Sequence, residues 1–490
     1  INQTYASYIT DHNNVVIVNA PKKEGVTNPT EEEVKGVIVK VKASEIAPYK
    51  DNTVKEPLIA NPEALKGSKV KKVAANETLG TTEWTLKNGI KVVVKPTTFK
   101  ADEVSIRMVA QSGVSNLTDE DYYTGKYMPM AMGQMGVGKF SSTELRKQLS
   151  GKSASTSVSP DDYTTTIAGN GSPKDLETIM QLLYLRFTAP RFNEDDFKAT
   201  MSQYISYVEN LKSNPDYKSS SEQLKTLYKN NYRRQQISTE VLNSIKYERL
   251  EPIYRALTAN AADYTVYVVG NVNLETLQPM VEKYIGSLPT SKKITKRVDD
   301  GVHYATGEVV NDFTHPMQQP KVSVCRIYTG DIEYNLENSV TMNFLQDILR
   351  SRYTISIREE KGGTYGVSAS VMLAPRIDEY TVQVMFDTNE QMADELTEIV
   401  FAEIEKIAKE GPLAEDMEKT REYENKNYAK TIEQNGWWST TLSQFYEYNI
   451  NRVEEYLPAV NGVTSADVQA MAKKILSDGN LIKVVMRPEK

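Results

Sequence analysis

The sequence predicts an α+β protein made of two homologous units, each a mainly antiparallel sheet with helices packed on one face, preceded by a linker and the tail of an earlier unit. Strand-like segments with alternating apolar residues and helix-like segments with apolar residues three or four apart are segregated along the chain. The chain has 490 residues, more than one hydrophobic core usually supports. The same spacing of acidic, apolar and turn-forming residues also occurs in two parts of the chain, which indicates an internal repeat.

Two pairs of segments carry this repeat. An aspartate leads through an apolar run to a proline in residues 11–21 and, with the same spacing, in residues 478–488. The acidic helix starts at Glu194 and Glu415 each lie 20 residues before an asparagine that opens another helix. We therefore predict four parts, namely the closing strand of a preceding unit (residues 1–21), a linker (22–78), a unit that we call repeat A (79–297) and a unit that we call repeat B (298–490).

Repeat A begins with a hairpin signal, in which Asn88-Gly89 separates two short apolar segments at residues 83–86 and 90–94. We predict that its closing strand, residues 264–269, is central in the sheet. The other elements predicted in repeat A are strands at 104–110, 154–158 and 163–168, two helices with an interruption within 119–150, a helix that Ser172-Pro173 begins, and a last helix at 274–288.

Repeat B and the linker show the same kinds of signal. In repeat B, an amphipathic helix from Met392 to Ile407 is predicted to stop at Gly411. In the linker, Thr30 opens a capping pattern for a helix over residues 30–41. The other elements predicted in repeat B are a strand at 322–327, a helix at 336–358 and a hairpin at 365–373 and 380–386.

Composition excludes several classes of protein. The net charge of −7 and the pI near 5.5 argue against a nucleic-acid surface. The single cysteine, Cys325, rules out an internal disulfide framework and a cysteine-based zinc cage. We find no apolar run near the ~18 residues that a membrane span needs, and no signal-peptide pattern. The sequence does not indicate a compartment, and the bacterial periplasm or cell envelope is the first one to test.

One stretch combines side chains suited to recognise a polar substrate group. Residues 357–367 begin as a helix end that carries Arg358. They pass through Gly362 and Gly363 into a strand that opens with Tyr365. Because glycines make a tight turn at low steric cost, a guanidinium and a phenol on either side of that turn can converge on one group. The alternative is a surface arginine and a strand-end tyrosine that flank an ordinary loop.

From residue 80 onward, the order of elements, the paired units joined by a long linker and the stretch 358–366 resemble the carboxy-terminal half of the M16 family of zinc metallopeptidases. The family includes pitrilysin and insulin-degrading enzyme. The resemblance implies two bowl-shaped halves that close around an unfolded peptide, with zinc in the first domain of the first half. It also implies that Arg358 and Tyr365 act catalytically on substrate near that metal, and that Gly362 and Gly363 belong to the same substrate-binding segment.

The family's metal ligands do not carry over to this chain. The histidines are His12, His303 and His315, and their spacing does not fit the family's inverted His-x-x-Glu-His motif. The segment that corresponds to the zinc helix, residues 127–133, offers methionine thioethers in place of hard ligands. We therefore expect no cofactor in this chain and zinc in the missing half of the parent enzyme. We expect the three histidines to be ordinary loop residues.

Two functions remain open at this point. In the first, the chain is the C-terminal half of an M16 zinc endopeptidase and supplies Arg358 and Tyr365 to an active site in the upstream half. Its partners are then the N-terminal catalytic half of the same protein and a peptide or unfolded polypeptide substrate, with no nucleic acid and no membrane span. In the second, it is a non-catalytic scaffold or peptide-binding subunit of the M16 fold. The start of the chain at a closing strand favours the first, in which this chain alone is inactive.

Overall fold

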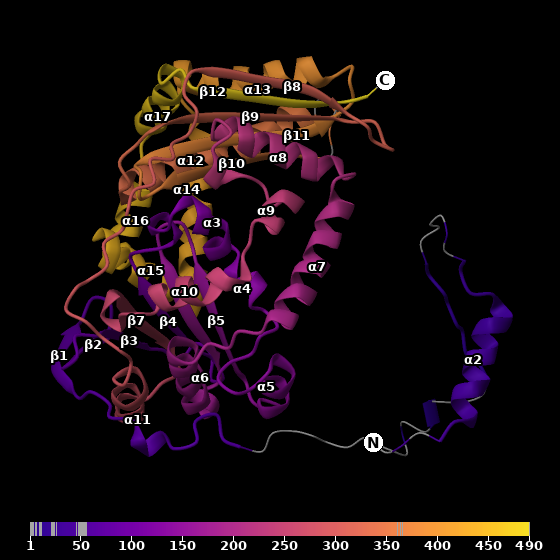
Figure 1. Cartoon of the computed structure of the whole chain (residues 1–490). Coiled ribbons are helices and arrows are strands. Elements are labelled where there is room, and N and C mark those ends of the chain that lie inside the picture. Colours follow the sequence, from indigo (N-terminus) through magenta and orange to yellow (C-terminus); the bar gives the residue numbers. More distant parts are fainter. Residues whose placement is uncertain are drawn as a thin grey trace. The chain divides into compact units, whose positions relative to one another are not determined.

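The computed structural model in Figure 1 contains two compact units, Ile1–Thr53 and Val54–Lys490. We call the second unit the main body. The structure describes residues 4, 7–8, 12–20, 25, 27–45, 47, 56–359, 361–362, 364 and 366–489. None of the helices within these residues has the length and apolarity needed to cross a membrane.

The unit Ile1–Thr53 contains the helix that the capping pattern predicts. Helix α2 spans Glu31–Ala43, and Thr30 caps it by accepting a hydrogen bond from the backbone N–H of Glu33. None of its described side chains is buried, so its cap and its own backbone hydrogen bonds stabilise the helix. The predicted closing strand, residues 1–21, is described in part, and residues 14–20 have no regular secondary structure.

The main body contains two sheets, which we call sheet A and sheet B. Sheet A has seven strands in the order β1-β2-β3-β7-β4-β6-β5, and sheet B has five in the order β10-β11-β9-β12-β8. The strands of sheet A are β1 (Val70–Asn76), β2 (Thr81–Leu86), β3 (Lys91–Pro96), β4 (Val104–Ala110), β5 (Ala154–Pro160), β6 (Thr165–Gly171) and β7 (Tyr264–Gly270). The strands of sheet B are β8 (Glu308–His315), β9 (Val322–Asp331), β10 (Val367–Ala374), β11 (Glu379–Thr388) and β12 (Leu481–Pro488).

The two sheets share one topology. The order β3-β7-β4-β6-β5 in sheet A corresponds strand by strand to β8-β12-β9-β11-β10 in sheet B. The strand directions agree as well. The parallel pairs are β3 with β7 in sheet A and β8 with β12 in sheet B, and every other neighbouring pair is antiparallel. The predicted α+β fold with two repeated units is therefore confirmed, including the central place of the strand that closes repeat A.

One face of each sheet is covered by helices from the same repeat as the sheet. In sheet A this core is closed by α6 and by α11, which continues as a π-helical turn at Val281–Ile285. In sheet B it is closed by α12, α13 and α17. The helices of the main body are α3 (Asp119–Lys126), α4 (Met128–Ala131), α5 (Ser142–Gln148), α6 (Leu176–Thr188), α7 (Glu194–Leu211), α8 (Pro215–Leu227), α9 (Thr239–Asn243), α10 (Tyr247–Leu257), α11 (Leu274–Met280), α12 (Leu336–Tyr353), α13 (Ala393–Glu410), α14 (Ala414–Thr431), α15 (Asn435–Tyr448), α16 (Arg452–Gly462) and α17 (Ser465–Ser477).

The opposite face of each sheet is covered by a helix from the other repeat, which differs from the prediction of helices on one face. Helix α15 lies against β7 and β4 of sheet A, where Trp438 and Leu442 pack into an apolar cluster. Helix α8 lies against β8, β9 and β12 of sheet B and buries Leu227 there. Figure 1 shows α8 next to sheet B. Because α8 and α15 hold equivalent places in the repeat, the exchange is reciprocal.

Other differences concern elements with weak local signals. Strand β1 (Val70–Asn76) lies inside the predicted linker 22–78, and β8 was not predicted at all. His315 is the last residue of β8, so the expectation that all three histidines lie in loops was wrong for this one. The helix predicted over 336–358 ends as α12 at Tyr353 and continues as a π-helical turn, Thr354–Glu359.

Candidate functional site

The predicted substrate-binding stretch begins where α12 passes into the π-helical turn Thr354–Glu359. Tyr353 is fully buried and its hydroxyl donates to the carbonyl oxygen of Val400 in α13 at 3.1 Å. Ile357 is also fully buried in the core of sheet B. These two side chains fix the turn, and the next residue, Arg358, is exposed.

The Arg358 side chain is available for a ligand. Within the described residues its guanidinium has no hydrogen bond or ion pair. Its carbonyl oxygen accepts from the N–H of Gly362 at 3.2 Å, and Gly362 has a φ of +62°, a conformation that favours glycine. Gly363 and Tyr365 lie outside the described residues, so the predicted convergence of Arg358 and Tyr365 stays a prediction.

Two described residues of the same stretch are held by polar contacts. The Lys361 ammonium pairs with the carboxylate of Glu395 in α13 at 2.6 Å. The hydroxyl of Thr364 donates to the carbonyl oxygen of Gly366 at 3.1 Å and accepts from its N–H at 3.3 Å. Lys361 thus forms an ion pair with an acidic side chain, whereas Arg358 forms none within the described residues.

A pocket of about 550 Å³ adjoins the C-terminal end of this stretch. Helix α8 of repeat A forms one wall, and the ends of β9, β10 and β11 form the others. Its floor contains Val324 and Phe386, both almost fully buried. On its rim, the ammonium of Lys321 lies 2.7 Å from carboxylate oxygens of both Asp216 and Asp387. The pocket is lined by Asp216, Ser219, Ser220, Gln223, Ser323, Val324, Thr364, Gly366, Val367, Ser368, Met385, Phe386 and Asp387.

Strand β10, which follows the stretch, forms an edge of sheet B that α12 partly covers. The Arg350 guanidinium donates to the carbonyl oxygen of Ala369 at 3.0 Å. The side-chain oxygen of Gln346, one turn earlier in α12, accepts from the N–H of Val371 at 2.9 Å. Two side chains therefore occupy outward backbone groups that a further strand would need at this edge.

The segment corresponding to the family's zinc helix does not fit a zinc ion. Helix α4, which follows α3, places Met128 and Ala131 in an apolar cluster, where they are almost fully buried. Carboxylates near these helices have other partners, because Asp121 binds Arg249 through two oxygens at 2.8 and 2.7 Å. Within the described residues, no three His, Cys, Asp or Glu side chains lie close enough to hold a metal. The expectation that this chain binds no zinc stays a prediction for direct measurement.

The histidines show no common role. His303 lies 2.6 Å from a carboxylate oxygen of Glu379 through its Nδ1 atom. The Nε2 atom of His315 is buried and has no hydrogen-bond partner among the described residues. Their separate environments give no indication of a metal site.

Comparisons with known proteins agree with this arrangement. Residues 244–423 match the family model described as the peptidase M16 inactive domain. The probable zinc protease PqqL of Haemophilus influenzae is 22% identical over 422 residues, which are 82% of this chain and 43% of that protein. The chain thus spans less than half the length of this relative.

Solved structures share the fold. The periplasmic protease PqqL from Escherichia coli has a TM-score of 0.78 at 18% identity, covering 94% of this chain and 51% of that one. The ferredoxin protease FusC, solved in complex with Arabidopsis ferredoxin, has a TM-score of 0.76 at 16% identity, covering 95% of this chain and 51% of that one. The family match over residues 244–423, the similarity to the PqqL zinc proteases and the shared fold together identify a peptidase M16 inactive domain in this chain.

Proposed function

We propose that the chain is the C-terminal half of an M16 zinc endopeptidase, encloses a peptide substrate and supplies Arg358 and Tyr365 to an active site in the N-terminal half. The observation that carries this proposal is the exposed Arg358 guanidinium, which has no partner within the described residues although its neighbour Lys361 is paired. The relatives support it, because the chain covers 43% of a probable zinc protease and 51% of a periplasmic protease.

The proposed role follows from the chemistry of the two side chains. Peptide hydrolysis develops negative charge on the carbonyl oxygen, and donors fixed near that oxygen stabilise the transition state. A guanidinium offers forked donors with a permanent charge, and a phenol offers one directional donor. Gly362, with its positive φ, turns the backbone between them. Arg358 is thus suited to orient the peptide backbone, and Tyr365 to donate to the oxygen.

We also propose the domain division predicted above, in which residues 1–21 close a preceding unit. In the repeat, residues 11–21 correspond to residues 478–488, which contain the central strand β12 of sheet B. In the described part of this segment, Val15 and Ile17 are each 84% exposed. Apolar side chains with the sequence pattern of a central strand are expected to be buried in a sheet, and the upstream half would provide that sheet.

Peptide-hydrolysis kinetics on the full-length parent protein test the proposal. We expect Tyr365→Phe to lower kcat by about 10- to 10³-fold, the scale of a single oxyanion donor, with the fold unchanged. Arg358→Ala should raise KM and lower kcat, and Arg358→Lys should not restore activity because an ammonium lacks the planar fork. Arg146→Ala, at an exposed arginine on α5, is the matched control and should keep the wild-type rate.

The outcomes separate the two functions. Wild-type rates in both the Arg358 and the Tyr365 variants would show that the pair has no catalytic role. A parent protein that binds peptides without cleaving them would support the scaffold or peptide-binding subunit instead.

A further inference from the structure

Strand β8 forms the edge of sheet B opposite β10, and its outward backbone groups are unpaired within the described residues. In the parallel pair with β12, the N–H of Leu481 donates to the carbonyl oxygen of Gly307 at 2.9 Å, and the N–H of Glu489 donates to that of His315 at 3.1 Å. The backbone groups of the odd-numbered residues therefore point toward β12. Those of residues 308, 310, 312 and 314 point away from the sheet.

The repeat shows what such an edge accommodates. Strand β8 corresponds to β3 of sheet A, and β3 has a further strand on its outer side. That strand is β2, which pairs antiparallel with β3 from Thr82–Val94 to Thr85–Lys91. Within the described residues, sheet B has no strand in the corresponding position beyond β8.

The two edges of sheet B differ in their protection. At β10, the side chains of Gln346 and Arg350 occupy outward backbone groups. Strand β8 has no such contact in the described part of the chain and no proline within its eight residues. Val310 at its middle is 61% exposed. Natural sheets usually protect a free edge with charged side chains, proline or a covering segment. The carboxylates of β8, Glu308 and Asp312, are paired with Lys483 and Arg487 of β12, so the edge keeps a backbone surface suited to pairing.

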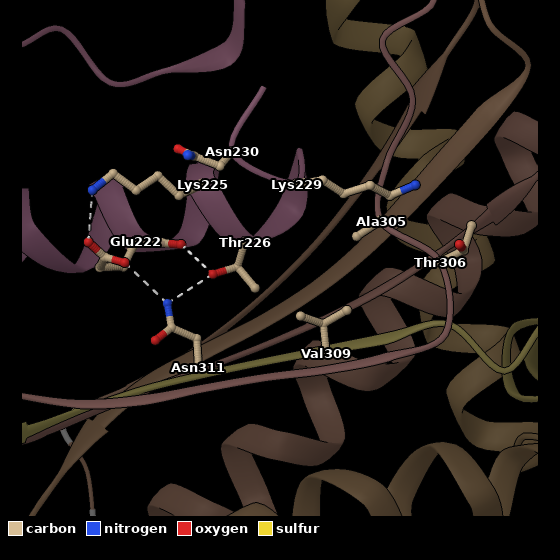
Figure 2. Close-up of a pocket in the computed structure, with 9 residues that line it drawn as sticks. All are labelled: Glu222, Lys225, Thr226, Lys229, Asn230, Ala305, Thr306, Val309 and Asn311. Carbon is tan, nitrogen blue, oxygen red and sulfur yellow. Dashed lines mark hydrogen bonds and ion pairs between the residues drawn. The ribbon is translucent and has the colours of Figure 1, made fainter. Parts of the chain in front are cut away.

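A pocket of about 560 Å³ adjoins the same edge on the side of α8. Figure 2 shows Val309 and Asn311 of β8 below α8, with Ala305 and Thr306 closing one end. An added strand would direct alternate side chains toward this face, beside those of Val309 and Asn311. The pocket is lined by Glu222, Lys225, Thr226, Lys229, Asn230, Ala305, Thr306, Val309 and Asn311.

The charge at this pocket is positive. Glu222 accepts from Lys218 at 2.8 Å, from Lys225 at 3.1 Å and from the amide of Asn311 at 3.2 Å, so its carboxylate is already satisfied. Lys229 is exposed, has no partner among the described residues and extends toward Ala305 and Thr306 in Figure 2. The lining residues carry two ammonium groups, those of Lys225 and Lys229, against the one carboxylate of Glu222, and this balance favours an acidic side chain.

We propose that the β8 edge and this pocket form a binding site for an extended, acidic peptide segment. The peptide adds to sheet B as a strand antiparallel to β8, as β2 does to β3. Its backbone pairs with the outward groups of residues 308–314, and one aspartate or glutamate side chain enters the pocket near Lys225 and Lys229. The site lies at the edge of sheet B opposite the Arg358 stretch and does not depend on the proposed catalytic role.

Fluorescence anisotropy with a labelled heptapeptide tests the pairing. The probe is Thr-Val-Thr-Glu-Thr-Val-Thr with blocked ends, which places the glutamate on one face of the strand. Val310→Pro removes an outward N–H and should weaken binding about five- to tenfold, while the ladder to β12 remains because edge positions of this kind tolerate proline. Val310→Ala, which retains the N–H, is the matched control and should bind like the wild type.

The peptide provides an independent check that needs no variant protein. N-methylation at the residues whose N–H groups face β8 should abolish binding, whereas N-methylation at the alternate residues should leave it unchanged. Equal effects of the two methylation patterns would overturn strand addition, even if Val310→Pro fails to fold.

Charge variants test the pocket. Lys229→Glu should weaken the glutamate peptide about tenfold and should have little effect on a peptide with glutamine in its place. Unchanged affinity for the glutamate peptide would overturn the acidic preference. The proposal would be refuted if the chain dimerises through β8. In that case Val310→Pro would abolish the dimer, the peptide would not compete with it, and the occupant of the edge would be a second copy of the chain.

Discussion

The reciprocal exchange of α8 and α15 predicts that the two repeats unfold together. Leu442 in α15 tests this, because it is fully buried against sheet A although it belongs to repeat B. It packs in one cluster with Val93 and Tyr267, which lie on strands of repeat A. Leu442→Ala removes this contact without adding a polar group.

The expected cost follows from the burial. A fully buried leucine replaced by alanine loses transfer free energy and leaves a cavity, so we expect the free energy of unfolding to fall by about 3 kcal/mol, within the usual range of 2–5 kcal/mol. Domains are stable by only about 5–15 kcal/mol, so this is a large fraction. Because the cavity lies between the repeats, both should lose stability.

Urea unfolding followed by tryptophan fluorescence and by circular dichroism measures this effect. The three tryptophans are well placed, because Trp84 is buried in the core of sheet A and Trp437 and Trp438 lie on α15. The two probes should show one coincident transition that moves to lower urea. Thr440→Ala, on the exposed side of α15, should change the free energy by less than about 0.5 kcal/mol. A loss below about 1 kcal/mol in Leu442→Ala, or two separate transitions with only repeat B affected, would refute the docking of α15.

Three further predictions concern titration and metal. Burial raises the pKa of Glu424 despite the hydrogen bond from Tyr456, so its stabilising contribution is present at acidic pH and is lost as pH rises through the folded-state pKa. Glu424→Gln should reduce this pH dependence in urea midpoints measured between about pH 4 and 7. Hydrogen bonds from Arg249 lower the pKa of Asp121, so its contribution is present above the ordinary carboxyl range and is lost as pH falls through the folded-state pKa. Asp121→Asn should therefore weaken the pH dependence of stability in that acidic range, as followed by circular dichroism. Elemental analysis of the chain purified with excess zinc should show no stoichiometric metal, and a tightly held zinc in α3 or α4 would contradict the assignment of a degenerate site.

Elements with local signals could be predicted from the sequence. The hairpin of β2 and β3 forms where Asn88-Gly89 predicts it, and Gly89 has the positive φ that this turn needs. Helix α13 ends at Gly411, which also has a positive φ. In both cases, a few neighbouring residues determine the backbone, so no knowledge of the rest of the fold was required.

Elements that depend on distant partners could not be predicted. Strand β8 alternates exposed and half-buried residues and includes Glu308 and Asp312, so its sequence resembles a polar loop until β12 pairs with it. The pocket beside it combines α8 with residues more than 70 positions later, which no local pattern indicates. For the stretch that carries Arg358, the sequence predicted a helix end but not the π-helical turn Thr354–Glu359, because that turn depends on the burial of Ile357 in the core of sheet B.

The fold also constrains how the two proposed sites can work together. Separation of the repeats would expose the apolar clusters under both α8 and α15, so the main body is expected to move as one piece. Strands β10 and β8 are then fixed edges of one sheet, four strand spacings apart. At about 4.8 Å per spacing they lie roughly 19 Å apart, a distance that about six extended residues span. The strand senses place the start of β8, beside Lys229, and the start of β10, after the Arg358 stretch, at opposite ends of the sheet, so only an unfolded polypeptide longer than these six residues would contact both sites.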